Sequence, residues 1–218
     1  MNTFFLDRLN SEPHALAFAG QSTPWPVALA DQSANPALDE ALHTHAAAAQ
    51  ALLYPVSAEL LATTGRPVDL FGFEPNPARL GAAAAASASV PGIALTQLGA
   101  LLDAAALGYN PAQAKPVAVL GHSQGVLAVH MVQAICEAGS IDAAAAKIDE
   151  ILAIATLIGV AGTRQARQLG LAARHGEATP MLSVKDITRA QVDALIERVD
   201  GARGPIAVAV TNSATHYV

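Results

Sequence analysis

The sequence has little charge, few aromatic residues and no run of Lys or Arg. Charged residues make up 14% and aromatic residues 4% of the 218 residues, whereas an ordinary soluble domain is roughly 25% charged. The formal net charge is −6. Electrostatic binding of nucleic acid is therefore excluded, because no basic patch is available to neutralise phosphates. The low charge leaves two interpretations open: alanine replaces charged residues on the surface, or neighbouring domains cover much of that surface.

The sequence also has only one cysteine, and it lacks a signal peptide and a long apolar run. The single cysteine, Cys136, excludes an internal disulfide and agrees with a reducing compartment; its apolar helical position predicts a buried thiol. Residues 1–8 lack the basic and apolar regions of a signal peptide. The strongest apolar stretch, residues 151–162, is shorter than the ~20 residues that cross a bilayer. We expect a cytoplasmic protein without membrane contact.

Hydrophobic residues are abundant, at 52%, and their pattern predicts strands alternating with helices. Residues 14–19 and 115–120 are short apolar runs that end in glycine-containing turns, which is typical of buried strands. Helices are expected between them, over 36–61 with a break at Pro55, and over 82–88 and 93–106 with Pro91-Gly92 as punctuation. This order predicts an α/β fold with a mostly parallel sheet.

After the second strand, the pattern predicts a helix over 126–137 closed by Gly139. A further helix is expected over 142–159, and its all-round apolar stretch, 151–155, predicts full burial. The composition of the sequence changes near residue 163, where a polar stretch begins. A strand at 180–184, a helix at 188–199 and a strand at 206–210 follow. We therefore divide the chain into an α/β core, 1–162, and the first part of a small α+β subdomain, 163–218.

The segment Gly121-His122-Ser123-Gln124-Gly125 has the Gly-x-Ser-x-Gly pattern between an expected strand and an expected helix. In a nucleophile elbow the glycines allow a tight turn, which exposes the serine oxygen at the carboxyl edge of the sheet. The helix N-terminus then favours a developing negative charge, and the backbone N–H of Gln124 is the expected oxyanion donor. The simpler alternative is a glycine turn that packs a helix on a strand.

A nucleophilic serine needs a base, and no histidine after Ser123 is a convincing one. His130 lies about two helical turns away on the same expected helix, and His175 falls in a polar connection where solvent exposure is expected. His216 lies at the end of the last apolar segment and remains a weak candidate. His122 flanks the nucleophile, and we expect it to shape the site.

Three features resemble the acyl-CoA:acyl-carrier-protein transacylase family. The segment 17–22 is similar to the family's Gly-Gln loop, and Gly121-His122-Ser123-Gln124-Gly125 is similar to its nucleophile segment. Thr211-Asn212-Ser213 resembles the Asn-containing strand end of the family's small subdomain. The resemblance is strongest to the acetyltransferase at the amino end of bacterial type I multienzyme fatty acid synthases. It is loose in the Ala-rich regions but spans the chain in the right order.

This resemblance implies a hydrolase-like parallel core with a small ferredoxin-like α+β subdomain, which is incomplete in this chain. It also implies a ping-pong reaction in which Ser123 takes an acyl group from acyl-CoA, with the N–H groups of Gln21 and Gln124 binding the oxyanion. The phosphopantetheine thiol of an acyl carrier protein then accepts the group. No permanently bound cofactor or metal is expected, and the expected partners are the carrier protein and other fatty acid synthase domains.

In the family that this sequence resembles, the catalytic histidine follows the small subdomain. This chain ends six residues after Asn212. We therefore expect a fragment whose base lies further downstream, so that the fragment alone is largely inert.

The acyl specificity is expected from the residue that replaces an arginine of malonyl-using members. That arginine pairs with the free carboxylate of the malonyl group. In this sequence, we place Ile158 at the position of that arginine. His122, Ile158 and Asn212 are the expected substrate-pocket residues, and acetyl is the favoured acyl group. Two alternatives stay open: Ile158 is ordinary core, or Arg164 serves malonyl.

Two other functions compete with the transacylase. An α/β-hydrolase esterase or thioesterase shares the elbow but needs Asp or Glu and then His after the serine, and a different upstream loop. A non-catalytic segment that anchors the amino end of a large assembly agrees with the low charge.

Overall fold

The computed structural model describes residues 3–20, 24–64, 86–168, 183–203, 206–208 and 210–217. It separates into two compact units, Met1–Gly176 and Glu177–Val218. The expected division after residue 162 falls inside helix α9, Ala145–Gln168, which continues into the first part of the expected polar stretch.

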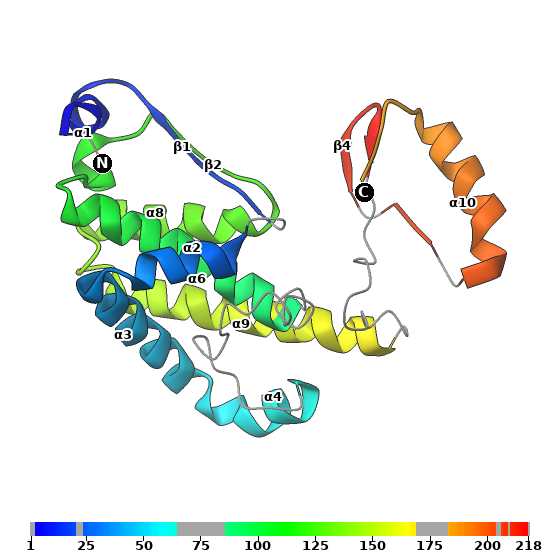
Figure 1. The fold of residues 1–218 in the computed structure, drawn as a ribbon, viewed down its shortest axis with the longest axis horizontal. Helices are drawn as coiled ribbons and strands as arrows, with labels where there is room; N and C mark the ends of the chain where they lie inside the picture. The colour runs from blue at the N-terminus through cyan, green and yellow to red at the C-terminus, as the bar shows by residue number, and fades with distance from the viewer. Residues whose placement is uncertain are drawn as a thin grey trace. The chain divides into compact units, whose positions relative to one another are not determined.

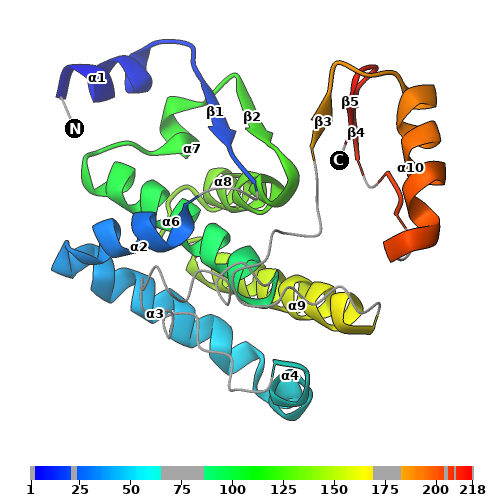
Figure 2. The ribbon, with the colours of Figure 1, turned by 45° about the vertical axis from the view of Figure 1, so that its right-hand side comes forward.

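Among the described residues of the first unit, two short parallel strands form a sheet. Strand β1 is Ala15–Phe18 and strand β2 is Ala118–Gly121, so both expected apolar runs form strands. Their register pairs Ala15 with Ala118 and Phe18 with Gly121. Figures 1 and 2 both show the two strands side by side, and both contact helix α8, Val126–Ala138. Since parallel strands end at the same edge, the loops after Phe18 and Gly121 are brought together.

The other regular elements described in the first unit are helices, and the expected break near Pro55 is present. There the chain passes from α3 through the 3-10 turn η1 into α4, because proline cannot continue the hydrogen-bond ladder of α3. Asn35 caps α3 by accepting a hydrogen bond from the Ala37 N–H at 3.2 Å. The bounds of the described helices before α8 are α1 Thr3–Ser11, α2 Trp25–Ser33, α3 Pro36–Leu52, η1 Tyr54–Val56, α4 Ser57–Thr64, α6 Ala86–Ala106 and α7 Pro111–Ala114.

Helix α6 is the central helix of the first unit and corrects one expectation. It runs unbroken through Pro91-Gly92, so the expected punctuation there is wrong. Pro91 lies in the second turn of the described helix, where the missing N–H removes few helical hydrogen bonds. Gly92 serves packing, because a Cβ at this position would lie 2.5 Å from Cε3 of the buried Trp25. Helix α6 contacts α2, α3, α8 and α9.

One helix in the described ranges, α6, is long and apolar enough to cross a membrane by length and composition alone. Its apolar window is 72% buried inside the protein, and residues such as Ile93, Leu95 and Leu98 are at most 1% exposed. The sequence had pointed to residues 151–162 as the strongest apolar stretch. The burial of α6 identifies it as a core helix.

Helices α8 and α9 follow the elbow and correct two further expectations. Gly139 ends α8 with φ 89°, as expected for a left-handed helix cap. Cys136 on α8 is exposed, so the expected buried thiol is wrong: the buried face of α8 is formed by neighbours such as Met131 and Ile135. Ile154 on α9 is 49% exposed; the expected full burial of residues 151–155 is therefore wrong, because only one face of α9 packs on α6 and α3.

A part-buried polar pair joins α3 to α9. His45 Nδ1 lies 2.6 Å from Asp149 Oδ1, and the two side chains are only 12% and 14% exposed. Leu42, about one turn before His45 on α3, and Ile148, directly before Asp149 on α9, are fully buried. The pair therefore fixes the position of α3 on the core by a directional contact within an apolar interface.

The second unit has one helix and three short strands among its described residues. Strand β3 is Val184–Lys185, helix α10 is Arg189–Arg203, and strands β4 and β5 are Thr211–Ser213 and His216–Tyr217. The strand order is β3-β5-β4, and both pairings are antiparallel. The expected strand over 206–210 is wrong: residues 206–208 and 210 are not in a strand, and pairing begins at Thr211, opposite Tyr217.

Candidate active site at the β2–α8 turn

The turn after β2 holds Ser123 in an unusual backbone conformation. Ser123 has φ 53°, which lies in the left-handed region that residues other than glycine rarely adopt. It begins the 3-10 turn η3, Ser123–Gly125, and α8 follows at Val126. The Gly125 N–H donates to the His122 carbonyl at 2.9 Å, which closes the turn. A serine held in this way is the structural signature of a nucleophile elbow.

Both glycines of the motif are required by close backbone approach. A Cβ on Gly121 would lie 2.5 Å from the carbonyl oxygen of Gly125, and a Cβ on Gly125 would overlap the Phe18 carbonyl. The His122 N–H also donates to the Phe18 carbonyl at 3.0 Å. The turn is therefore pressed against the end of β1, which leaves no room for side chains at these two positions.

The loop after β1 meets the nucleophile directly. A Cβ on Gly20 would lie 2.5 Å from the His122 carbonyl oxygen, 2.7 Å from Ser123 Cβ and 3.2 Å from the Gln124 nitrogen. Gly20 itself is buried. The backbone that enters the Gly-Gln segment thus lies against the serine, as expected from the parallel pairing of β1 and β2. Gln21, the expected second oxyanion donor, lies outside the described residues.

The environment of Ser123 suits an attacking oxygen. Ser123 and His122 are exposed and Gln124 is half-buried. Helix α8 begins three residues after the serine, so its N-terminal N–H groups and the positive end of its dipole face the turn. This arrangement stabilises negative charge near the serine oxygen, which is the requirement of an acyl-transfer site.

In the described part of the first unit, no histidine ring is hydrogen-bonded to Ser123 Oγ. His130 is exposed on α8, about two turns from the elbow, as expected. His216 lies in the second unit, where its Nε2 atom is 2.9 Å from Ser183 Oγ. His175 lies outside the described residues.

The other expected pocket residues lie on separate elements. Ile158 is on α9 and is 49% exposed, and Asn212 is exposed in β4 of the second unit. Arg164, the alternative malonyl partner, donates from Nη1 to Glu59 Oε1 of α4 at 2.8 Å. Its guanidinium is thus already paired with a carboxylate of the protein.

One residue near the elbow was missed in the sequence. Gln97 of α6 is 8% exposed, and its Nε2 atom donates to the Ala19 carbonyl at 2.5 Å. The sequence feature that could have identified Gln97 is its position as a lone amide side chain within the apolar run 93–102. A buried polar side chain in a core helix requires a specific hydrogen bond, and here the bond is made to the residue before Gly20.

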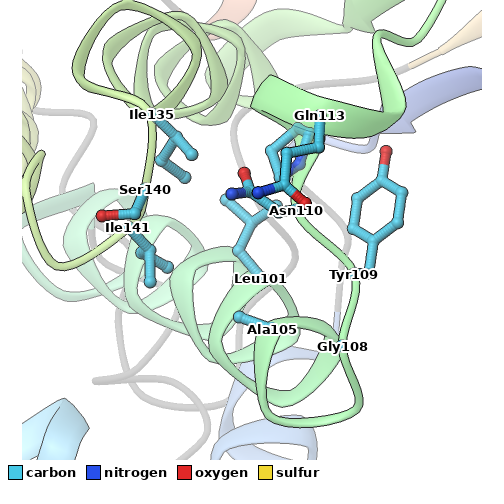
Figure 3. A pocket seen from close by; sticks show the side chains of 10 residues that line it. Leu101, Ala105, Gly108, Tyr109, Asn110, Gln113, Ile135, Ser140 and Ile141 are labelled. Carbon is cyan, nitrogen blue, oxygen red and sulfur yellow. The ribbon is translucent and has the colours of Figure 1, made fainter. Parts of the chain in front are cut away.

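A cavity of about 210 Å³ lies elsewhere in the first unit (Figure 3). It is formed where the carboxyl ends of α6 and α8 approach α7, and Asn110 there donates to the Gly139 carbonyl and caps α7. The elbow lies at the opposite end of α8, about 20 Å away by helical rise. This cavity is therefore separate from the Ser123 site. Its lining includes Leu101, Tyr109, Asn110, Gln113, Ile135 and Ser140.

No group of three or more His, Cys, Asp or Glu in the part of the chain that the structure describes is arranged to hold a metal ion.

The elbow and its strand–turn–helix setting define the class of serine-dependent acyl-transfer and hydrolytic enzymes. Within that class, the sequence model of the family described as starter unit:ACP transacylase in aflatoxin biosynthesis matches residues 74–216, about two thirds of the chain. The chain therefore belongs to the starter unit:ACP transacylase family. No curated protein matches the sequence.

Family membership confirms the expected acyltransferase at this coarser level: the chain is of the type that transfers acyl groups to acyl carrier protein. The matched residues include Ser123, Ile158 and Asn212, so the nucleophile segment lies within the family's own span.

Proposed function

We propose that this chain loads a short acyl group, acetyl in preference, from CoA onto Ser123 and passes it to the phosphopantetheine thiol of an acyl carrier protein. The setting we propose is a cytoplasmic fatty acid synthase multienzyme, without a permanently bound cofactor. The observation that supports this most is the exposed Ser123 at φ 53° with Gly20 against it, in a chain of an acyl-carrier-protein transacylase family.

The reaction has two half-reactions. In the first, the Ser123 oxygen attacks the thioester carbon, loses its proton to a base and forms a tetrahedral oxyanion, which collapses as the C–S bond breaks and CoA leaves as the thiol. In the second, the carrier thiol attacks the acyl-serine and the serine oxygen leaves with a proton. The N–H groups of Gln124 and Gln21 stabilise both oxyanions in this proposal.

The base in this proposal is a histidine from a part of the protein outside the described ranges. In the described part of the first unit, no histidine ring is hydrogen-bonded to Ser123 Oγ. In the second unit, the Nε2 atom of His216 lies 2.9 Å from Ser183 Oγ. His122 shapes the mouth of the site as a neighbour of the nucleophile, and we assign Asn212 to the substrate pocket on the basis of the resemblance alone.

The preference for a monocarboxylic acyl group rests on Ile158 and Arg164. An isoleucine offers no donor to a malonyl carboxylate. Arg164 is paired with Glu59, so its use for malonyl would require that contact to break. Both observations support acetyl over malonyl.

The family description introduces a second candidate substrate. It names a starter unit in aflatoxin biosynthesis, so a longer starter acyl group for a polyketide-type multienzyme is the alternative to acetyl. The two are distinguished by chain length: comparison of acetyl-CoA with hexanoyl-CoA and octanoyl-CoA as donors separates them, since a pocket fitted to acetyl rejects the longer chains by overpacking.

We further propose that β1 and β2 are part of a larger hydrolase-like parallel sheet, with the second unit as part of a ferredoxin-like subdomain. Val117 and Leu120 are 72% and 59% exposed beside a strand that is paired on one edge by β1. Parallel sheets normally have both faces covered. These exposed apolar residues support further strands and helices packing there in the complete fold.

The proposal is tested by following the acyl group through both half-reactions in the full-length protein. Radiolabelled acetyl-CoA should label the protein, and added holo carrier protein should remove the label as acetyl-carrier thioester. Ser123→Ala should abolish both steps, and the exposed Ser183→Ala should leave them unchanged. Release of the label as free acetate at the same rate with and without carrier protein would instead support a hydrolase. Unchanged transfer by Ser123→Ala would support a non-catalytic segment.

A further inference from the structure

Gln97 is a buried polar residue in the centre of the apolar helix α6. It is 8% exposed, and its neighbours Ile93, Ala94 and Leu98 are at most 1% exposed. Its Oε1 atom is buried and has no hydrogen-bond partner among the described residues. A buried carbonyl without a partner opposes folding, so the presence of glutamine here calls for a compensating role of its other amide atom.

That other atom, Nε2, donates to the Ala19 carbonyl at 2.5 Å. Ala19 lies between strand β1 and Gly20, and its carbonyl also faces Gly125, whose added Cβ would come within 3.0 Å of it. Gly20 in turn lies against Ser123 and the Gln124 nitrogen. Helix α6 itself contacts the turn η3. A single side chain thus links the core helix to the strand end that borders the nucleophile.

We propose that Gln97 is a positioning residue for acyl transfer at Ser123. Its bond to Ala19 fixes the orientation of the peptide units that lead into the Gly20-Gln21 segment. Without this bond, Ala19 and Gly20 shift relative to Ser123, and the backbone that borders the oxyanion is misplaced. Gln97 acts through the backbone and does not touch the substrate. This inference rests on the proposed function.

Gln32 of α2 provides a matched control in the same core. It is half-buried, its Nε2 atom donates to a backbone carbonyl of α6, Thr96, at 2.8 Å, and its Oε1 atom is also buried without a partner among the described residues. Its bond joins two helices and does not reach the segment beside Ser123. Gln32→Met therefore removes the same kind of bond as Gln97→Met, on the residue next to Gln97, and leaves the Gln97 bond to Ala19 in place.

The test measures the rate of Ser123 acylation by acetyl-CoA in the full-length protein, per folded molecule, across acetyl-CoA concentrations. Gln97→Met keeps the side-chain volume and removes the donor; we expect the saturating rate to fall about 10- to 100-fold and the half-saturating concentration to change less than about twofold. Gln32→Met should retain the wild-type rate. Equal rates for Gln97→Met and Gln32→Met would overturn the proposal.

The variant Gln97→Glu supplies a readout that a packing role would not change. When protonated, the introduced carboxyl can donate to Ala19 as the amide does; when ionised, it repels that carbonyl. Burial raises the pKa of such a carboxyl, so acylation should approach the wild-type rate at low pH and fall as the pH rises through that pKa. Wild-type protein should lack this fall. A wild-type pH profile in Gln97→Glu would contradict the inference.

The controls separate this inference from the proposed function. If wild-type Ser123 is not acylated, the proposed function fails. If wild-type Ser123 is acylated and Gln97→Met is acylated equally well, the function holds and the positioning role is refuted. The folded fraction is measured by circular dichroism before each assay. A folding defect in Gln97→Met therefore lowers the yield but leaves the rate per folded molecule interpretable. If Gln97→Met does not fold, the pH profile of Gln97→Glu decides between the two outcomes.

Discussion

Gly20 and Ser123 are in backbone contact: a Cβ added to Gly20 would lie 2.7 Å from Ser123 Cβ and 2.5 Å from the His122 carbonyl oxygen. These residues are 103 positions apart in the sequence, and the parallel pairing of β1 with β2 brings them together. The contact places Gly20 and the nucleophile elbow at one edge of the sheet. It is the relationship on which an oxyanion site at Ser123 depends.

The first prediction concerns this contact. Gly20→Ala should lower the rate of Ser123 acylation by about 100-fold, because the added methyl group must displace the elbow backbone, and small displacements at a reacting centre have effects of this size. The measurement is single-turnover acylation by acetyl-CoA in the full-length protein.

Gly162→Ala is the matched control for Gly20→Ala. Gly162 is exposed in helix α9, and the nearest atom to an added Cβ is Ala86 Cβ at 3.2 Å. We expect an unchanged acylation rate. If Gly20→Ala retained the wild-type rate as well, the close approach of the two loops would have no role in the reaction.

The second prediction concerns the crossing of α2 and α6. Gly92→Ala should lower the free energy of unfolding by about 1–3 kcal/mol, because the added methyl group overlaps the ring of Trp25, which is only 3% exposed. Urea unfolding followed by Trp25 fluorescence measures this. A stabilised Gly92→Ala, as helix propensity alone would give, would show that the packing constraint is wrong.

The third prediction concerns acyl-chain length. If Ile158 borders the acyl pocket, Ile158→Ala should raise the rate of loading from butyryl-CoA and hexanoyl-CoA relative to acetyl-CoA. Its side chain is 49% exposed, so we expect little loss of stability and an interpretable variant. The exposed Ile154→Ala on the same helix is the control. Equal chain-length preferences in wild type and Ile158→Ala would remove Ile158 from the pocket.

The fourth prediction concerns the pH dependence of Cys136 reactivity. Partial burial and, to a lesser extent, the neighbouring Glu137 carboxylate raise the pKa of the Cys136 thiol. Because the thiolate is the nucleophile, iodoacetamide should alkylate Cys136 more slowly than free cysteine at pH 8, and the difference should narrow as the pH rises through the raised pKa. Glu137→Gln should lower the pKa and speed the reaction. Faster alkylation than free cysteine at neutral pH would contradict this assignment.

Local features of the fold could be predicted from the sequence because they depend on local chemistry. Both strands of the parallel pair, the break near Pro55 and the helix end at Gly139 were predicted from short apolar runs, proline and glycine. The strand-to-helix turn at Ser123 was predicted from the spacing of Gly121 and Gly125, and its backbone geometry confirms the elbow.

The errors arose where tertiary packing decided the outcome. Pro91-Gly92 resembles a break, but the glycine admits the Trp25 ring and the helix continues. Cys136 and Ile154 are apolar by type, yet each lies on the outward face of its helix. Gln97 could be identified only from the structure, because its partner is a backbone carbonyl 78 residues away. The roles of Ile158 and Asn212 remain predictions.

The most direct test of the account is to locate the acyl group. The full-length protein is incubated with acetyl-CoA, quenched in acid and digested, and the acylated peptide is identified by mass spectrometry. We predict acetyl on Ser123 and none in Ser123→Ala. An acetyl group on another side chain, such as Ser183 beside His216, with Ser123 unmodified, would contradict the central claim that the elbow serine is the nucleophile.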